Sequence, residues 1–324
     1  MRTNLLLAMV NVSVLVGLFI VGAYAKPAPP WTRTIDSIVS TDWLAASSAK
    51  VVILDIRSPV DYVAGHIPGS INEPFVTGFD PCTGPSSKWI IGTDDCLWLQ
   101  VPEKEDLFKT IGNLGISGDS RVVIVTAPNP DEPPFYGLAN ATRVADTLIY
   151  AGVKNVAILD GGYPKWVAED RPISTDPTNA TPTMYQAKVN EEMFVSIEYV
   201  QKQIKKAVII DARDADVYFG VTIEPFAEKA GHIPNAKSLP TPWIWVTEGG
   251  SYIYKDTETL SAMASGVIGK HKAKEIIVYC GVGGYASSWW FVLTQVLGYE
   301  NVKFYDGSAQ EWVKDFDMVP YQWN

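Results

Sequence analysis

Basic residues are scarce in this chain and never gather into a run. The 324 residues include 26 Lys and Arg against 36 Asp and Glu, which gives a formal net charge of −10. Proteins that bind nucleic acid normally carry a basic patch or stripe. We therefore expect no nucleic-acid partner.

Histidine and cysteine are also sparse. The three histidines are spread singly, and the three cysteines include no closely spaced pair. Protein metal sites are built from clusters of such ligands. The phosphate-cradling pattern Gly-x-Gly-x-x-Gly is missing as well. We expect neither a metal nor a cofactor.

The longest apolar run lies at the N-terminus. Residues 5–22, after Arg2, are nearly all apolar, and Ala23-Tyr24-Ala25 follows as a small-x-small cleavage pattern. This order predicts a signal peptide over residues 1–25 and an exported, periplasmic or extracellular protein. The alternative is an uncleaved anchor, because about 18 apolar residues come close to spanning a bilayer. Only in that case would the membrane be a partner.

Cysteine usage fits an exported protein. Cys82 and Cys96 lie in one loop rich in Gly, Pro and Asp. Disulfides persist in oxidising compartments, so we predict a bridge between them; two unpaired thiols are the alternative. In both cases Cys280 has no evident partner, and a lone cysteine in such a setting suggests a reactive thiol.

The chain repeats one pattern twice. Residues 51–57 and 207–213 are apolar runs that end in Asp-x-Arg, and Gly-His-Ile-Pro follows each of them. Each copy then has three further parts. They are an apolar run (residues 121–126 and 275–280), a helical stretch (138–151 and 286–297), and an Asp-Gly segment followed by a Trp (156–166 and 302–312). Short β-branched runs of this kind indicate buried strands.

Alternation of strands and helices indicates a fold class. We predict an α/β protein with two tandem domains, each a mainly parallel sheet flanked by helices. The expected domains are residues 31–175, which we take as non-catalytic, and 190–324, which we take as catalytic. Residues 176–189, near a stretch rich in Pro, Thr and Asn, are the expected linker.

The two copies differ at the end of the second apolar run. The first copy has Thr126 there, whereas the second has Cys280 followed by a turn with three glycines. Glycines let the backbone curl so that its N–H groups form an anion receptor, and a helix begins at about Ala286 with its positive end toward the loop. These features favour the thiolate, so we expect the pKa of Cys280 to lie below its free value of about 8.5. A buried structural cysteine is the alternative reading.

These motifs together resemble the tandem-domain rhodaneses, the thiosulfate and 3-mercaptopyruvate sulfurtransferases. The resemblance rests on both Asp-x-Arg segments, both Gly-His-Ile-Pro segments, both Asp-Gly segments and the cysteine loop, and it covers the whole mature chain. It implies that a silent first domain precedes a catalytic second one, with the active site between them. It further implies a transferase in which Cys280 takes a sulfane sulfur from a donor and hands it to an acceptor.

Loop length separates this chain from the related phosphatases. Residues 280–285 form a six-residue loop, as in sulfur-transferring members, and no Arg or Lys occurs between Cys280 and Lys303. A phosphoryl group would lack its bidentate cation. The donor stays open, because Gly281 and Val282 match neither the Arg-Lys pair of thiosulfate-specific members nor the Gly-Ser of mercaptopyruvate-specific ones.

The candidate site follows from these comparisons. Cys280 is the expected nucleophile, and the expected substrate-binding residues are Arg213, Gly281, Val282, Gly283, Gly284, Tyr285 and Ala286. In the family an Arg at the position of Arg213 binds the donor's charged group, but Arg57 in the silent copy shows that this residue can serve structure alone. His66 and His232 are also duplicated, and we expect structural roles for both.

Three functions remain open from the sequence. The leading one is sulfur transfer from thiosulfate or 3-mercaptopyruvate to cyanide, sulfite or a thiol, with a redox partner protein as a further acceptor. The second is a sulfur carrier that hands its persulfide to a protein partner without turnover. The third is a scaffold that has lost catalysis, against which the intact cysteine loop argues.

Overall fold

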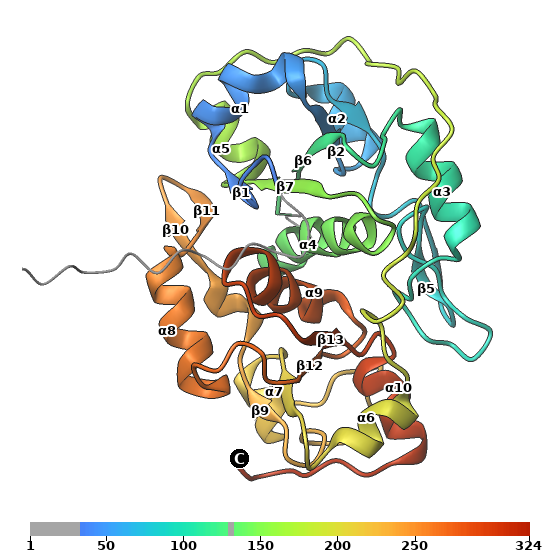
Figure 1. Ribbon diagram of the computed structural model, residues 1–324, viewed down its shortest axis with the longest axis vertical. Coiled ribbons are helices and arrows are strands. Elements are labelled where there is room, and N and C mark those ends of the chain that lie inside the picture. Colours follow the sequence, from blue (N-terminus) through green and yellow to red (C-terminus); the bar gives the residue numbers. More distant parts are fainter. Residues whose placement is uncertain (1–32, 129–132) are drawn as a thin grey trace, which may run out of the picture.

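Two parallel sheets form the centre of the structure, each built from the short apolar runs of one repeat. The computed structural model describes residues 33–128 and 133–324. The first sheet has the strand order β1-β7-β6-β2-β3 and the second β13-β12-β8-β9, with parallel pairing throughout both. The predicted α/β fold class is confirmed, and Figure 1 shows the two halves one above the other.

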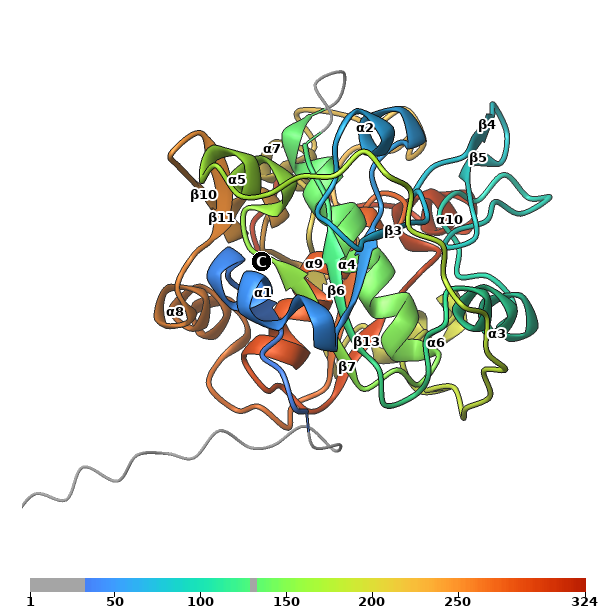
Figure 2. The ribbon, with the colours of Figure 1, turned by 90° about the horizontal axis from the view of Figure 1, so that it is seen from above.

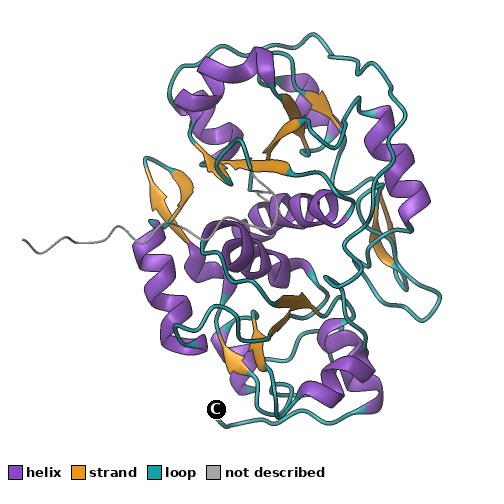
Figure 3. Cartoon of the chain, viewed as in Figure 1, coloured by secondary structure: helices purple, strands orange, loops and turns teal. Residues whose placement is uncertain are grey.

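The first half contains these strands and helices: β1 (Ile38–Val39), α1 (Thr41–Ser47), η1 (Ser48–Lys50), β2 (Val52–Asp55), α2 (Pro59–Ala64), β3 (Ile71–Asn72), β4 (Gly78–Asp80), β5 (Gly84–Ser86), α3 (Lys104–Asn113), β6 (Arg121–Val125), α4 (Pro134–Tyr150), β7 (Asn155–Leu159) and α5 (Gly162–Ala168). Strands β4 and β5 form a separate antiparallel hairpin. Figure 3 shows the helices around the strands of each sheet.

The second half repeats this order: α6 (Ile197–Gln203), β8 (Val208–Asp211), α7 (Ala215–Phe219), β9 (Lys237–Ser238), η2 (Thr241–Ile244), β10 (Trp245–Glu248), β11 (Ser251–Tyr254), α8 (Thr257–Ile268), β12 (Ile276–Tyr279), α9 (Gly284–Phe291), the π-helical turn η3 (Val292–Val296), β13 (Val302–Phe304) and α10 (Ser308–Asp315). Residues 176–189 carry no helix or strand. The repeat expected from the sequence is therefore present in both halves, although among the described residues the second sheet has four strands where the first has five.

The duplicated Asp-x-Arg segments make the same contacts in both halves. Arg57 Nη2 lies 2.6 Å from Asp55 Oδ2 and donates to the Gly65 carbonyl at 2.8 Å. Arg213 Nη2 lies 2.6 Å from Asp211 Oδ2 and donates to the Gly231 carbonyl at 2.7 Å. Each aspartate also accepts the backbone N–H of its arginine and so closes the turn after the strand.

The histidines of the two Gly-His-Ile-Pro segments are structural, as expected. The Nδ1 atom of His66 lies 2.8 Å from the Tyr62 carbonyl oxygen, and that of His232 lies 2.9 Å from the Tyr218 carbonyl oxygen. Each imidazole is fully buried and stacks on the ring of the same tyrosine. Each histidine thus ties a turn to the preceding helix.

The two halves meet through equivalent helices. Helices α4 and α9 lie side by side at the centre of the molecule in Figures 1 and 2. Thr142 Oγ1 lies 2.7 Å from Ser287 Oγ and 2.9 Å from Ser288 Oγ across this contact. One apolar cluster continues through the contact, from Leu148 on α4 to Trp289 on α9. The shared core fixes each half against the other.

No helix among residues 33–128 and 133–324 is long and apolar enough to cross a membrane. The predicted signal peptide, residues 1–25, lies outside the described residues.

Candidate active site around Cys280

Strand β12 delivers Cys280 to the carboxyl edge of the second sheet. The strand lies between β8 and β13 and ends at Tyr279, so the cysteine is the first residue beyond it. Open parallel sheets bind ligands at this edge. The Cys280 backbone N–H donates to Ser308 Oγ at 3.2 Å, which anchors the start of the loop to the turn after β13.

The glycine turn wraps backbone N–H groups around the sulfur. Gly283 donates to Cys280 Sγ at 3.1 Å, and the N–H groups of Val282 and Ala286 also hydrogen-bond to the thiol and lower its pKa. Gly283 has φ 89°, a left-handed conformation that favours glycine. Helix α9 begins at Gly284, two residues before the expected start, so its N-terminal end faces the sulfur.

The expected depression of the Cys280 pKa is wrong. Burial raises the pKa of this thiol to about 11, because desolvation outweighs the surrounding N–H groups. The charge of Glu224 raises it further. The sequence shows the glycine nest, but it does not show the depth at which the fold buries the thiol, which is 2% exposed.

Cys280 opens into a cavity of about 420 Å³ between the two halves. The second half contributes Glu224, Phe226, Gly281, Val282, Gly284 and Tyr285 beside the cysteine. The first half contributes the opposite wall, which consists of Phe75, Val76, Phe79, Pro85, Trp98, Leu99, Tyr136, Ala139 and Asn140. The half that lacks a cysteine therefore shapes the site, as the sequence suggested.

Among the described residues that line this cavity, Glu224 is the one with a charged side chain, and sequence reasoning missed it. A Cβ placed on Gly281 would lie 2.7 Å from Glu224 Oε2, so the carboxylate lies over the residue next to the nucleophile. Burial raises the pKa of Glu224 to about 7, although the nearby Arg213 lowers it. Glu224 occurs in a segment without regular pattern, and only the tertiary fold brings it to Cys280.

Arg213 takes a different position from the one expected for a donor-binding residue. Its side chain is buried, held by Asp211 and the Gly231 carbonyl, and Nη1 lies 3.5 Å from Glu224 Oε2. Arg213 does not line the cavity; its neighbour Glu224 does. Its contacts match those of Arg57 in the first half, which is the structural role that the duplication suggested.

The predicted disulfide is present and supports the wall of the cavity. Cys82 and Cys96 are bridged, with Cα atoms 4.7 Å apart. The Trp98 indole donates to the Cys82 carbonyl at 2.7 Å, and the Trp98 backbone N–H donates to Gln310 Oε1 of the second half at 2.9 Å. The bridged loop thus holds the Trp98 ring in the cavity wall.

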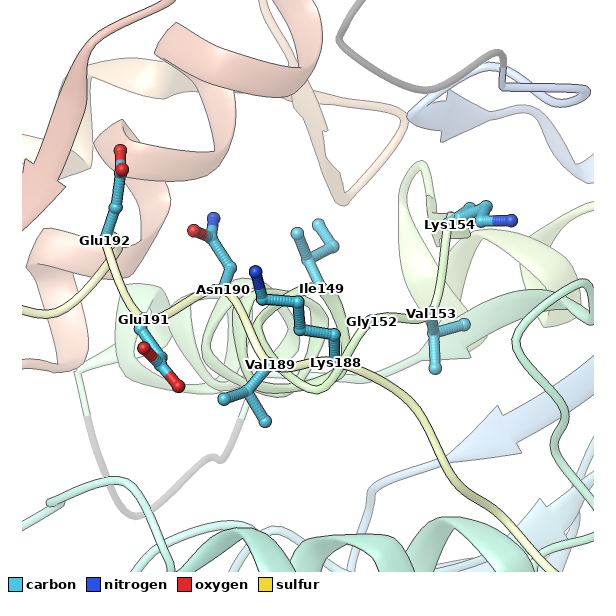
Figure 4. Close-up of a pocket in the computed structure, with 9 residues that line it drawn as sticks. All are labelled: Ile149, Gly152, Val153, Lys154, Lys188, Val189, Asn190, Glu191 and Glu192. Carbon is cyan, nitrogen blue, oxygen red and sulfur yellow. The ribbon is translucent and has the colours of Figure 1, made fainter.

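Three tryptophans of the second half lie outside the lining of this cavity. Trp289 and Trp290 are buried in the core, and Trp245 stacks on Phe135 of the first half. A second cavity, of about 440 Å³, lies where the end of α4 meets residues 188–192, at the end of the linker, and Figure 4 shows its lining from Ile149 to Glu192. It contains no residue of the Cys280 site. Within the described ranges no group of three or more His, Cys, Asp or Glu is placed to hold a metal ion.

Known proteins share this architecture and much of its sequence. The model of the rhodanese-like domain matches the chain twice, at residues 40–169 and 196–315. The chain is 31% identical over 293 residues to "Sulfur carrier protein TtuD" of Thermus thermophilus, covering 85% of this chain and 93% of that protein. It is 30% identical over 291 residues to "Putative thiosulfate sulfurtransferase" of Mycobacterium leprae, covering 86% and 94% respectively.

Solved structures of EanB have the same fold. The wild-type structure superposes with a TM-score of 0.70 at 20% identity, over 88% of this chain and 70% of that one. A persulfide-bearing EanB variant with ergothioneine superposes with a TM-score of 0.71 at 21% identity, over 88% and 71%.

Proposed function

The chain belongs to the rhodanese family, and from that premise we propose that it transfers a sulfane sulfur from a small donor to a thiophilic acceptor through a persulfide on Cys280. One observation carries the proposal. The thiol lies at the inner end of a cavity between the halves, with the N–H groups of Val282, Gly283 and Ala286 around its sulfur. Relatives named as sulfur carriers and thiosulfate sulfurtransferases support it.

The reaction has two half-steps. In the first, the Cys280 thiolate attacks the sulfane sulfur, the bond from that sulfur to the rest of the donor breaks, and the remainder leaves with the electron pair. In the second, the acceptor attacks the outer sulfur of the persulfide and Cys280 leaves as the thiolate. The N–H groups of the loop stabilise negative charge on sulfur in both states.

The residues proposed to hold the substrate are those of the loop. Gly281, Val282, Gly284 and Tyr285 line the cavity, while Gly283 and Ala286 contribute N–H groups to the sulfur. Thiosulfate and 3-mercaptopyruvate are the candidate donors, and cyanide, sulfite, a thiol or a redox partner protein the candidate acceptors.

Intact-mass spectrometry tests the proposal. The purified protein is measured before and after it is mixed with thiosulfate, 3-mercaptopyruvate or inorganic polysulfide, beside a Cys280→Ser variant. We expect a gain of one sulfur, about 32 Da, in the native protein alone. No gain with any of the three donors would refute persulfide chemistry at this site.

A sulfur carrier without turnover is the second candidate. The relative named a sulfur carrier and the uncharged residues after Cys280 favour it. Steady-state thiocyanate production from cyanide separates the two: an enzyme turns over many times, whereas a carrier loads once and discharges only to its protein partner.

We also propose that the protein is exported. The N-terminal segment supports this, and so does the Cys82–Cys96 bridge, because disulfides persist outside the reducing cytosol. N-terminal sequencing of the mature protein tests cleavage after Ala25. We further propose that residues 31–175 and 190–324 are separate domains. Limited proteolysis tests this, and we expect cleavage in the linker, residues 176–189.

A further inference from the structure

The cavity above Cys280 has an unusual charge for a site that handles anionic sulfur compounds. Glu224 is the charged side chain that lines it, and no Lys or Arg among the described residues does so. An anionic donor or acceptor entering this cavity would lose its water and meet a carboxylate instead of a cation. The lining therefore favours neutral and cationic molecules over anionic ones of similar size, and it slows loading from an anionic donor without preventing it.

The nearest arginines do not compensate. Arg213 is paired with Asp211 at 2.6 Å, donates to the Gly231 carbonyl at 2.7 Å, and lies 3.5 Å from Glu224 Oε2. Arg143, on α4, is paired with Asp306 at 2.6 Å and is fully buried. Both arginines are thus engaged with carboxylates, and of these charged residues Glu224 is the one that lines the cavity.

Six aromatic residues line the cavity beside Glu224. They come from both halves and are Phe75, Phe79, Trp98, Tyr136, Phe226 and Tyr285. The Trp98 and Phe226 ring centroids lie 5.8 Å apart, and those of Tyr136 and Tyr285 lie 5.2 Å apart. Ring faces beside a carboxylate attract ammonium groups and accept apolar carbon chains.

Backbone N–H groups of the cysteine loop provide an anion-binding feature at the sulfur. The loop N–H groups point at Cys280 Sγ and so serve the sulfur itself. A substrate thus meets two environments: N–H donors at the reacting sulfur, and an acidic aromatic wall around the rest of the molecule.

We propose that this cavity selects, as the sulfur acceptors of Cys280, small organic thiols whose substituents carry no negative charge, and prefers those that carry an ammonium group. The inference rests on the proposed persulfide function and adds its substrate class. The acceptor thiolate RS⁻ attacks the outer sulfur of Cys280–S–SH, the sulfur–sulfur bond breaks, and the products are R–S–SH and the Cys280 thiolate. One negative charge enters and one remains, so no further reagent is required.

The first test measures charge selectivity at the thiol and does not depend on persulfide formation. The native full-length mature protein is treated at pH 8.5 with methanethiosulfonates that carry either a trimethylammonium-ethyl or a sulfonato-ethyl group. Glu224 is ionised at this pH, since burial raises its pKa only to about 7. The rate of Cys280 modification by each reagent is divided by the rate at which the same reagent modifies free 2-mercaptoethanol, which corrects for the reagents' intrinsic reactivity. We expect the cationic reagent to be favoured at least about tenfold, given the Coulomb energy of a partly buried pair.

Glu224→Gln is the matched variant, since it keeps the shape of the side chain and removes the charge. We expect it to bring the ratio close to that of the free thiol. Glu228→Gln, an exposed change of the same charge, should leave the ratio as it is. A ratio near one in the native protein, or a preference for the sulfonate, would overturn the inference.

The second test follows discharge of the persulfide. Protein loaded with inorganic polysulfide is mixed with cysteamine, 2-mercaptoethanol or mercaptoacetate, which are similar in size and differ in charge. After correction for the fraction of each acceptor present as thiolate, the rate of persulfide discharge should be highest with cysteamine, lower with 2-mercaptoethanol and lowest with mercaptoacetate. Equal rates would overturn the inference. Failure to load at all would refute the proposed function, while the methanethiosulfonate ratios would still decide the selectivity of the cavity.

Discussion

Replacing Glu224 with Gln should make Cys280 more acidic. The charge of this carboxylate raises the pKa of the thiol, which is about 11 in the native protein. Glutamine keeps the volume and the hydrogen-bonding capacity of the side chain but carries no charge. The thiolate then loses the one unfavourable charge neighbour that the described part of the cavity lining contains.

The size of the effect follows from the geometry. The Glu224 oxygens would lie 2.7 and 3.0 Å from a Cβ on Gly281, the residue that follows the nucleophile. A charge at roughly 6 Å across an effective dielectric constant of about 20 is worth about 3 kcal/mol. Arg213, 3.5 Å from Oε2, offsets part of this energy. We expect the pKa of Cys280 to fall by about one, which corresponds to 1.4 kcal/mol.

The assay is the rate of iodoacetamide alkylation as a function of pH. Since Cys82 and Cys96 are bridged, Cys280 is the free thiol that reacts. Between pH 8 and 10, where Glu224 is ionised in the native protein, the variant should react about tenfold faster. Glu228→Gln should react at the native rate. An unchanged pH profile in Glu224→Gln would refute the contribution of Glu224 to the raised pKa of Cys280.

Three further changes test other parts of the site. Val282→Lys places a cation in the cavity lining, and we expect loading from thiosulfate, measured by intact mass, to rise about tenfold; no rise would contradict the electrostatic reading. The Cys82→Ser, Cys96→Ser double variant removes the bridge, and urea unfolding should show a loss of about 3 kcal/mol with slower sulfur loading; native stability and loading would show that the bridge does not support the wall. Gly283→Ala forces a side chain into φ 89° and displaces the N–H that contacts the sulfur, so loading should fall about tenfold, whereas Gly266→Ala, at a position with open space, should load normally.

Much of the fold was predictable because it depends on local pattern and repetition. The runs at residues 52–55 and 208–211 are strands β2 and β8, and the loop after Cys280 is the tight turn that three glycines imply. The disulfide was predictable too, since its two cysteines share one loop. Such features involve residues close in the chain, whose geometry the residue types largely determine.

The position of Arg213 shows where sequence reasoning stopped. An arginine after a strand can face a substrate or pair with the aspartate two residues before it, and both outcomes have the same sequence. The structure has the pair, buried at the end of β8. Only the packing of the surrounding chain excludes this side chain from the cavity.

By itself, the sequence determined that two α/β repeats exist, that the second alone carries a cysteine at the strand end, and that N–H groups surround it. Only the tertiary structure decided the chemistry of the cavity: the burial that raises the pKa of Cys280, the carboxylate of Glu224 above it, and the aromatic wall from the other half. The physical reason is that desolvation and Coulomb interactions depend on distances between residues far apart in the chain, and the packing of α4 on α9 sets those distances.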